Sequence, residues 1–279
     1  MRQVSILAII ALSWGCGKSV EKAEPVVASK PEVVTLEETN ATSVVSTKPQ
    51  EIKIKLTDGK FVFGTLSPSE GGKDAPVILL FHQVDSNRGE YETISKRLVD
   101  EGYNCFAVDQ RSGGTMWGRD NATAKQYSEK QGYDSSYADI SAVFDWSKKE
   151  GYSKIILWGS SYSASLVLRI GAENKGISEL ICASPGEYFN DRGIVKQWAM
   201  KLSATPFFIC AKRESEQVAA IFDVIPIEDK SLLEQDPGVH GSSAFIAAKN
   251  PKSEEAWKSL LDFLGSLPEQ ESEPSNEQP

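Results

Sequence analysis

Apolar residues along this chain gather in short unbroken runs, with segments of helical spacing between them. The unbroken runs, each as long as a strand buried on both faces, lie at residues 77–81, 105–108, 155–158, 180–183 and 207–211. Helical spacing of apolar side chains occurs at 91–102, 137–151, 164–170 and 253–267. Near the start of the pattern, apolar and polar residues alternate on both sides of Asp58-Gly59, which predicts a two-stranded hairpin. The order predicts an α/β fold, with a mostly parallel central sheet covered by helices on both faces.

The folded domain predicted from this pattern covers residues 51–267, and the segments on either side differ from it in composition. Residues 16–50 are rich in Ser, Thr, Glu, Lys, Val and Pro without a sustained apolar period, so we expect a flexible tether. Residues 268–279 are acidic and contain proline, which predicts a disordered tail. A single catalytic domain accounts for the length between them.

The first residues have the composition of an export signal. A charged start precedes an apolar stretch over residues 4–12, which is too short to cross a bilayer because a spanning helix needs about 20 residues. We therefore predict a signal peptide over residues 1–15. It resembles a bacterial lipoprotein signal, which implies that Cys16 is the lipidated residue, and Gly17 after it favours the outer membrane, facing the periplasm. The alternative is an ordinary secretory signal and a soluble secreted protein.

Charge and cysteine content narrow the classes of partner. The net charge is −9 and no run of basic residues is present, which argues against a nucleic-acid surface. Cys105, Cys182 and Cys210 each lie inside an apolar run, so we expect buried free thiols. No residues have the clustered spacing of metal ligands, and we expect neither a metal nor a cofactor. The sequence leaves the oligomeric state open.

A candidate nucleophile lies between one predicted strand and the helix that follows it. Gly159-Ser160-Ser161-Tyr162-Ser163 comes directly after the run at 155–158, and small residues flank Ser161. A serine on such a tight turn projects its hydroxyl from the sheet edge beside free backbone N–H groups. A serine nucleophile needs a base, and the chain has only His82 and His240. His240 lies downstream of the serine, whereas His82 ends an earlier strand, where we expect it to brace a loop.

Four motifs in this order resemble the α/β-hydrolase superfamily, nearest its small esterase and dienelactone-hydrolase-like members. They are FHQVDSNRGEY, VDQRSGG, LWGSSYS and GVHG, and the match spans roughly residues 51–267. The resemblance implies an α/β-hydrolase fold without a large cap domain. It also implies a catalytic triad in the chain order serine, acid, histidine, with Ser161 as nucleophile and His240 as general base.

The resemblance also directs the search for the acid and the oxyanion hole. Ala211-Lys212-Arg213-Glu214 follows a predicted strand and resembles the family's G-x-x-D, so Glu214 is the first choice. Glu216 and Glu187 are the alternative acids. The oxyanion hole is expected from the main-chain N–H groups of Val84 and Tyr162.

These residues predict a serine hydrolase that cleaves a compact carboxylic ester through an acyl-enzyme on Ser161. The loops have no room for a large cap, which favours small-molecule esters, and apolar residues in those loops are candidates for an acyl pocket: Met116, Trp117, Trp198 and Met200. Thioesterase, peptidase and carbon–carbon hydrolase activities remain open because all use the same triad. The alternative from another class is a catalytically idle lipoprotein of this fold that binds a ligand or a cell-envelope partner. It is suggested by the nonstandard Gln83, Ser163, Ala211 and Glu214.

Overall fold

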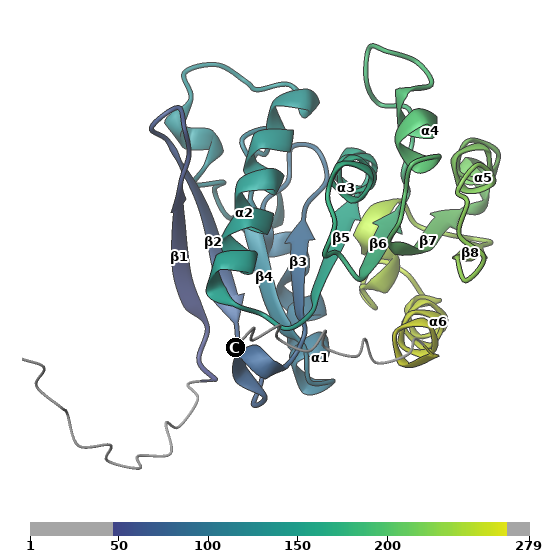
Figure 1. Ribbon diagram of the computed structural model, residues 1–279, viewed down its shortest axis with the longest axis horizontal. Coiled ribbons are helices and arrows are strands. Elements are labelled where there is room, and N and C mark those ends of the chain that lie inside the picture. The colour runs from purple at the N-terminus through teal and green to yellow at the C-terminus, as the bar shows by residue number, and fades with distance from the viewer. Residues whose placement is uncertain (1–46, 267–279) are drawn as a thin grey trace, which may run out of the picture. The chain divides into compact units, whose positions relative to one another are not determined.

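Eight strands build the central sheet of the computed structural model, which describes residues 47–266. The strands are β1 (Gln50–Lys55), β2 (Phe61–Ser67), β3 (Val77–Phe81), β4 (Asn104–Asp109), β5 (Ile155–Ser160), β6 (Glu179–Ala183), β7 (Thr205–Ala211) and β8 (Ser231–Gln235). They pair in the order β1-β2-β4-β3-β5-β6-β7-β8 (Figure 1). Neighbouring strands in the part β4-β3-β5-β6-β7-β8 of this order are all parallel. Strand β2 is antiparallel to both β1 and β4. The predicted hairpin and mostly parallel sheet are confirmed.

Strand β8 is the part of the sheet that the apolar pattern did not predict. It lies at the edge of the sheet, paired only with β7, and most of its residues are partly exposed. Its sequence is SLLEQ, without an unbroken apolar run, because an edge strand does not have to bury both faces. This strand leads into the loop that carries His240.

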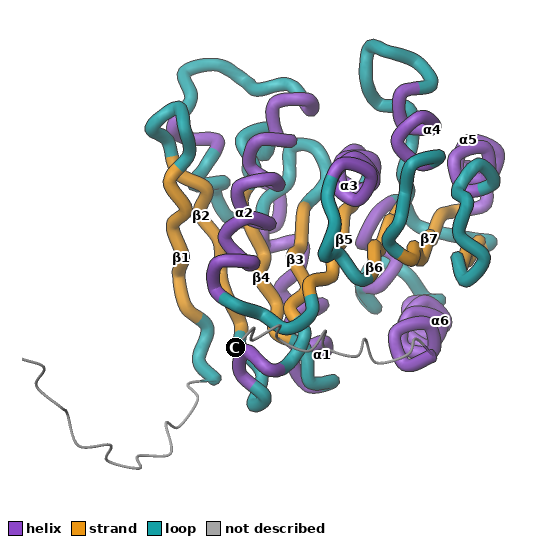
Figure 2. Tube along the Cα trace, in the orientation of Figure 1, coloured by secondary structure: helices purple, strands orange, loops and turns teal. Residues whose placement is uncertain are grey.

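Helices cover both faces of the sheet, as Figures 1 and 2 show. They are α1 (Glu92–Asp100), α2 (Ser136–Glu150), α3 (Tyr162–Glu173), α4 (Ile194–Ala199), α5 (Ser215–Phe222) and α6 (Ser253–Ser266). Apolar side chains of α2, α3, α4 and α5 join one buried cluster, and those of α1 and α6 join a second. The two clusters are separated by the sheet, whose central strands are buried on both faces.

The connections at the carboxyl ends of the strands contain no large cap domain within residues 47–266. Between β6 and β7 the only helix is the short α4, and between β4 and α2 there are only single 3₁₀ turns. No helix in this described range is long and apolar enough to cross a membrane. The predicted signal peptide at 1–15, Cys16, most of the predicted tether at 16–50 and the tail at 268–279 lie outside the described residues.

The three cysteines of the described range are free and buried, as predicted. Burial raises the pKa of the Cys105 and Cys182 thiols, so both stay protonated and pack as small apolar side chains. No group of three or more His, Cys, Asp or Glu residues between 47 and 266 is arranged to hold a metal ion.

Candidate active site

Ser161 occupies the turn between β5 and α3 in a strained backbone conformation. Its φ is 59° and its ψ is −125°, a region that residues with a side chain rarely adopt. The turn is tight because α3 starts directly over the strand: a Cβ on Gly159 would lie 2.4 Å from the backbone nitrogen of Ala164. Glycine at 159 is therefore a steric requirement of this turn.

Ser163 stands where the usual motif has a second glycine, and its hydroxyl is fully used inside the fold. It donates to the carbonyl oxygen of His82 at 2.7 Å and accepts from Nε2 of Gln110 at 3.0 Å. These bonds join the start of α3 to the ends of β3 and β4. Ser163 is larger than the glycine of the usual motif, but its hydroxyl is hydrogen-bonded to His82 and Gln110, and the turn is kept.

His240 lies in the loop after β8 and contacts both other predicted members of the triad. Its Nε2 is 2.8 Å from Ser161 Oγ, and its Nδ1 is 2.8 Å from Oε1 of Glu214. An ionised carboxylate can only accept, so Nδ1 carries the proton and Nε2 accepts from the serine hydroxyl. The ring is thus oriented to take the hydroxyl proton of Ser161.

Glu214 lies in the 3₁₀ turn Lys212–Glu214 that follows β7, and it is the carboxylate in contact with His240. Its Oε2 accepts from Oγ of Ser184 at 2.7 Å and from the backbone N–H of Ala211 at 3.3 Å. Burial acts to raise the pKa of Glu214, but the hydrogen bonds from His240 and Ser184 outweigh burial and hold the pKa below its ordinary value. The side chain is therefore ionised at neutral pH.

The two alternative acids lie elsewhere. Glu187 accepts from the backbone N–H groups of Gly193, Val195 and Lys196 at 3.0 to 3.2 Å, which caps the start of α4. Glu216 is exposed on α5. Neither hydrogen-bonds to His240, so the hydrogen-bond geometry favours Glu214 among the three.

Ser184 was not identified by sequence reasoning. It follows β6 with a φ of 56° and is almost wholly buried. Its hydroxyl donates to Glu214 and accepts from the backbone N–H of Gly241 at 2.9 Å, so it joins the acid to the histidine loop. Its carbonyl oxygen accepts from the hydroxyl of Tyr188 at 2.9 Å. The only signal in the sequence is its place directly after a buried strand.

The two backbone N–H groups expected to form the oxyanion hole are those of Val84 and Tyr162. The N–H of Val84, in the loop after β3, has no acceptor within residues 47–266. The N–H of Tyr162 begins α3, where the first N–H groups of a helix lack intrahelical acceptors. Both can donate to an oxygen that develops negative charge.

Side chains below the Val84 loop hold it in place. His82 donates from Nδ1 to the carbonyl of Gln83 at 2.7 Å, and its Nε2 accepts from the N–H of Gln110 at 2.9 Å. Burial lowers the pKa of His82 to about 4, so the ring is neutral and braces the loop. Glu90 accepts from the N–H of Gln83 at 3.0 Å and from Oγ of Ser86 at 2.8 Å.

Glu90 is a buried carboxyl group that sequence reasoning also missed. It lies in the 3₁₀ turn Arg88–Tyr91, and its Oε1 has no hydrogen-bond partner within the described residues. Burial raises its pKa, against smaller opposing effects from Ser160 and other hydrogen-bond donors. Through its bonds to Gln83 and Ser86, this carboxyl group supports the loop that carries Val84.

A cleft of about 420 Å³ contains none of the three triad residues in its lining, but two of its aromatic side chains contact their neighbours: Tyr133 stacks on Tyr162, and Tyr188 donates to the carbonyl of Ser184. Its wall residues come from the loops before α2 and after β6 and include three aromatic side chains, Tyr133, Tyr188 and Phe189. The residues expected to line an acyl pocket lie elsewhere: Trp117 donates to Ser86, Trp198 packs edge-on against Phe189, and Met116 and Met200 are exposed. These four residues do not line this cleft, and their part in an acyl pocket stays a prediction.

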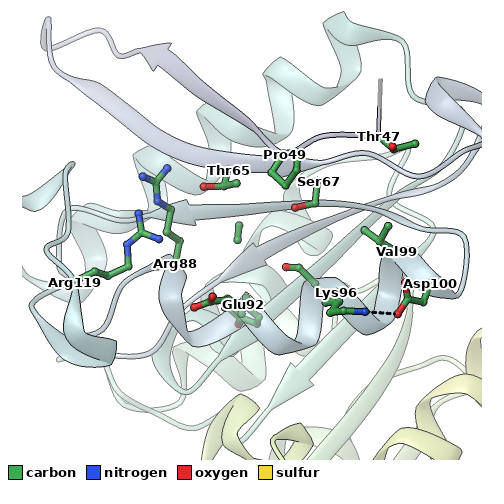
Figure 3. A pocket seen from close by; sticks show the side chains of 13 residues that line it. Thr47, Pro49, Thr65, Ser67, Arg88, Glu92, Lys96, Val99, Asp100 and Arg119 are labelled. Carbon is green, nitrogen blue, oxygen red and sulfur yellow. Dashed lines mark hydrogen bonds and ion pairs between the residues drawn. The ribbon is translucent and has the colours of Figure 1, made fainter. Parts of the chain in front are cut away.

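A second cavity, of about 370 Å³, lies between β2 and α1 (Figure 3). Arg88 and Arg119 lie side by side at one end of it, and Lys96 pairs with Asp100 at the other. Glu51 lies 2.7 Å from Arg88 and offsets its charge. This cavity contains none of Ser161, His240 and Glu214.

Comparison with solved structures shows the same fold in several enzymes. The Pyrococcus furiosus esterase Pf2001 aligns over 78% of this chain and 90% of its own, with 20% identity and a TM-score of 0.61. A putative dienelactone hydrolase from Klebsiella pneumoniae aligns over 79% and 99%, with 14% identity and a TM-score of 0.62. Est1E from Butyrivibrio proteoclasticus, bound to ferulic acid, aligns over 77% and 100%, with 16% identity and a TM-score of 0.61. Identities this low show the fold alone.

A search of curated proteins found no match. The sequence model of the serine aminopeptidase S33 family, in contrast, matches residues 72–240, more than half of the chain. The matched range runs from before β3 to His240 and includes the serine turn and the Glu214 turn. The chain therefore belongs to the serine aminopeptidase S33 family and is a serine hydrolase of the α/β-hydrolase fold.

Proposed function

We propose that this protein hydrolyses a compact carboxylic ester through an acyl-enzyme on Ser161. The observation that carries the proposal is the unbroken hydrogen-bond chain from Ser161 through His240 to Glu214. A serine hydroxyl with an imidazole nitrogen at 2.8 Å, on a ring that is itself oriented by an ionised carboxylate, is arranged for proton transfer during attack on a carbonyl carbon.

The reaction proceeds in two halves. His240 takes the proton of Ser161 as the oxygen attacks the ester carbonyl, and the N–H groups of Val84 and Tyr162 bind the oxygen that becomes negative. The protonated His240 then gives its proton to the leaving alcohol. Water then enters, and His240 takes a proton from it as the water oxygen attacks the acyl carbon. His240 gives that proton to Oγ of Ser161 as the bond between Oγ and the acyl carbon breaks, which releases the acid and restores the serine hydroxyl. Glu214 stays ionised throughout and stabilises the imidazolium.

An ester is favoured over the larger substrates that this triad can also process. The connections above the sheet contain no large cap domain within residues 47–266, and the cleft lined by Tyr133 and Tyr188 has a volume of about 420 Å³. The fold is shared with esterases, and also with an acylaminoacyl peptidase of Pyrococcus horikoshii, of which only 43% is covered. The uncovered remainder of that peptidase has no counterpart among the described residues here.

The test is turnover of short acyl esters by wild type and matched serine variants. Ser161→Ala is expected to lower kcat by at least about 10⁴-fold with unchanged circular dichroism, because the nucleophile is lost. Ser147→Ala, which removes a buried hydroxyl on α2 that bonds only to the carbonyl of Phe144, is the control and keeps wild-type kcat. Full turnover in Ser161→Ala would overturn the proposal. The absence of turnover in wild type across ester, thioester and peptide substrates would favour the idle binding protein.

We further propose that the enzyme is held at the outer membrane, facing the periplasm, by a lipid on Cys16. Support comes from the first residues of the sequence, where a short apolar stretch precedes Gly15-Cys16. Growth with an alkyne fatty acid, followed by detection of the labelled protein, should show lipid in wild type and none in Cys16→Ser. A soluble, unlabelled wild-type protein would instead identify an ordinary secretory signal.

A further inference from the structure

The cleft of about 420 Å³ includes an aromatic side chain, Tyr133, that is stacked on the residue after the nucleophile. The rings of Tyr133 and Tyr162 are nearly parallel, with centroids 4.7 Å apart and an interplanar angle of 17°. The hydroxyl of Tyr162 is held by Ser112 at 2.5 Å and by Gln110 at 3.0 Å. Tyr162 is therefore held in place, and the Tyr133 ring packs on it.

Tyr188 forms another wall of the same cleft. Its hydroxyl donates to the carbonyl of Ser184, the residue that holds Glu214. Burial raises the pKa of Tyr188 to about 12. The phenol is therefore neutral at physiological pH, and its hydrogen bond joins this wall of the cleft to Ser184.

The rest of the cleft lining combines one further aromatic side chain with polar residues, among them Lys130 and Asp134. Phe189 is the third aromatic side chain, and its ring is braced edge-on by Trp198 at 5.4 Å. Lys130 pairs with Asp85 at 2.6 Å, and both side chains are at least half exposed. The cleft volume of about 420 Å³ exceeds the roughly 150 Å³ that is enough to hold a benzene ring.

The side of the scissile bond that this cleft serves follows from the position of His240. The leaving oxygen must face Nε2 of His240, which protonates it. None of the residues that line the cleft hydrogen-bonds to His240, and Tyr133 packs on Tyr162, one of the two expected oxyanion donors. The contact with Tyr162 favours the acyl side of the ester for this cleft.

We propose that this cleft is the acyl subsite and that it selects a flat aromatic acyl group, whose ring packs against Tyr133 and Tyr188. The inference rests on the proposed esterase function and adds the substrate class to it. Aromatic pairs contribute beyond the area they bury, enough for a preference of about two- to tenfold per ring.

The experiment compares kcat/KM for two ethyl esters that differ only in the acyl group, ethyl cinnamate and ethyl hexanoate. Tyr133→Leu and Tyr188→Leu are each expected to lower the cinnamate-to-hexanoate ratio by about two- to tenfold. Tyr188→Phe keeps the ring and should keep the ratio. Tyr103→Leu makes the same chemical change and serves as the matched control. Tyr103 directly precedes β4, at the amino end of that strand, whereas the cleft is formed by loops at the carboxyl ends of strands.

Three results would overturn the inference. The first is an unchanged ratio in both Leu variants. The second is that the Leu variants keep the cinnamate-to-hexanoate ratio of kcat/KM but lower the ratio for phenyl acetate over ethyl acetate. These two acetates differ only in the leaving group, so that result would assign the cleft to the leaving group. If wild type hydrolyses none of these esters, the proposed function fails separately, and calorimetry with cinnamate then decides the subsite. Binding that Tyr133→Leu weakens would support the aromatic subsite, and no binding by wild type would overturn it.

Discussion

Glu214 has one more rotatable bond than the aspartate that this kind of triad often contains, and its hydrogen bonds offset that freedom. One carboxylate oxygen contacts His240, and the other accepts from Ser184 and from the N–H of Ala211. The same Ser184 hydroxyl accepts from the N–H of Gly241, next to the histidine. Ser184 thus positions the acid and the base relative to each other.

Removing the Ser184 hydroxyl should reduce activity without unfolding the protein. We expect Ser184→Ala to lower kcat/KM by about 10- to 100-fold, because a hydrogen bond to a charged group is lost and the N–H of Gly241 loses its acceptor. Ser184→Gly separates strain from chemistry, since glycine adopts the φ of 56° freely yet also lacks the hydroxyl. Steady-state kinetics should show similar losses in both. Retention of activity in Ser184→Gly alone would assign the effect to backbone strain.

Glu90 should make the stability of the protein depend on pH in a defined direction. Burial raises its pKa above 4.5, so as pH rises from 4.5 the unfolded chain loses this proton while the folded chain keeps it. Stability then falls with rising pH until Glu90 ionises in the folded state as well. Its neighbours in that network are Gln83, Ser86, Ser160 and, through charge, His240.

The comparison that isolates this effect is Glu90→Gln, which keeps a neutral acceptor at the same place. Urea unfolding at pH 4 to 8 should show the free energy of unfolding of Glu90→Gln rising relative to wild type as pH increases. Glu90→Leu should lose stability at every pH, because the N–H of Gln83 then lacks its acceptor. A constant difference between Glu90→Gln and wild type across this range would show that Glu90 is ionised in the folded protein.

At the scale of elements, the strand-turn-helix unit of β5 and α3 is the most sterically constrained part of the site. A Cβ at position 159 would lie 2.4 Å from backbone atoms of Ser163 and Ala164, which cannot move independently of the helix. We expect Gly159→Ala to lower the free energy of unfolding by about 1–3 kcal/mol. Gly265→Ala, in α6 with nothing within 4 Å, should instead be neutral or stabilising by up to about 1 kcal/mol. Urea unfolding of both variants tests the contrast, and equal effects would contradict it.

The elements that the sequence predicted are those whose burial is uniform. Strands β3, β5, β6 and β7 are unbroken apolar runs because helices cover both of their faces. Strand β8 is partly exposed at the edge, and the six-residue α4 is too short to show a period, so neither was predicted.

The site divides in the same way. Ser161 and His240 were predictable because the chain offers one serine turn and only two histidines. Which of the three glutamates is the triad acid depends on which side chain reaches His240. The local sequence does not determine this, because it depends on how the loops after β6 and β7 fold. Ser184 and Glu90 were missed because their importance comes from partners distant along the chain, such as Glu214 for Ser184.

At the scale of the whole molecule, the sheet brings loops from β3, β5, β6, β7 and β8 to one edge, and within residues 47–266 no large domain covers that edge. Access to Ser161 should therefore not require a lipid surface to displace a cap. With ethyl butyrate as substrate, we expect the rate to follow simple saturation through the solubility limit. A sharp rise in rate once droplets form would contradict an open site.

The most direct test of the account is whether Ser161 is an activated nucleophile in the folded protein. The purified protein would be treated with a fluorophosphonate, and the adduct located by peptide mass spectrometry. We expect one adduct, on Ser161, that His240→Ala abolishes and Ser147→Ala leaves unchanged. Folded wild-type protein that carries no adduct, or labelling that survives His240→Ala, would contradict the triad.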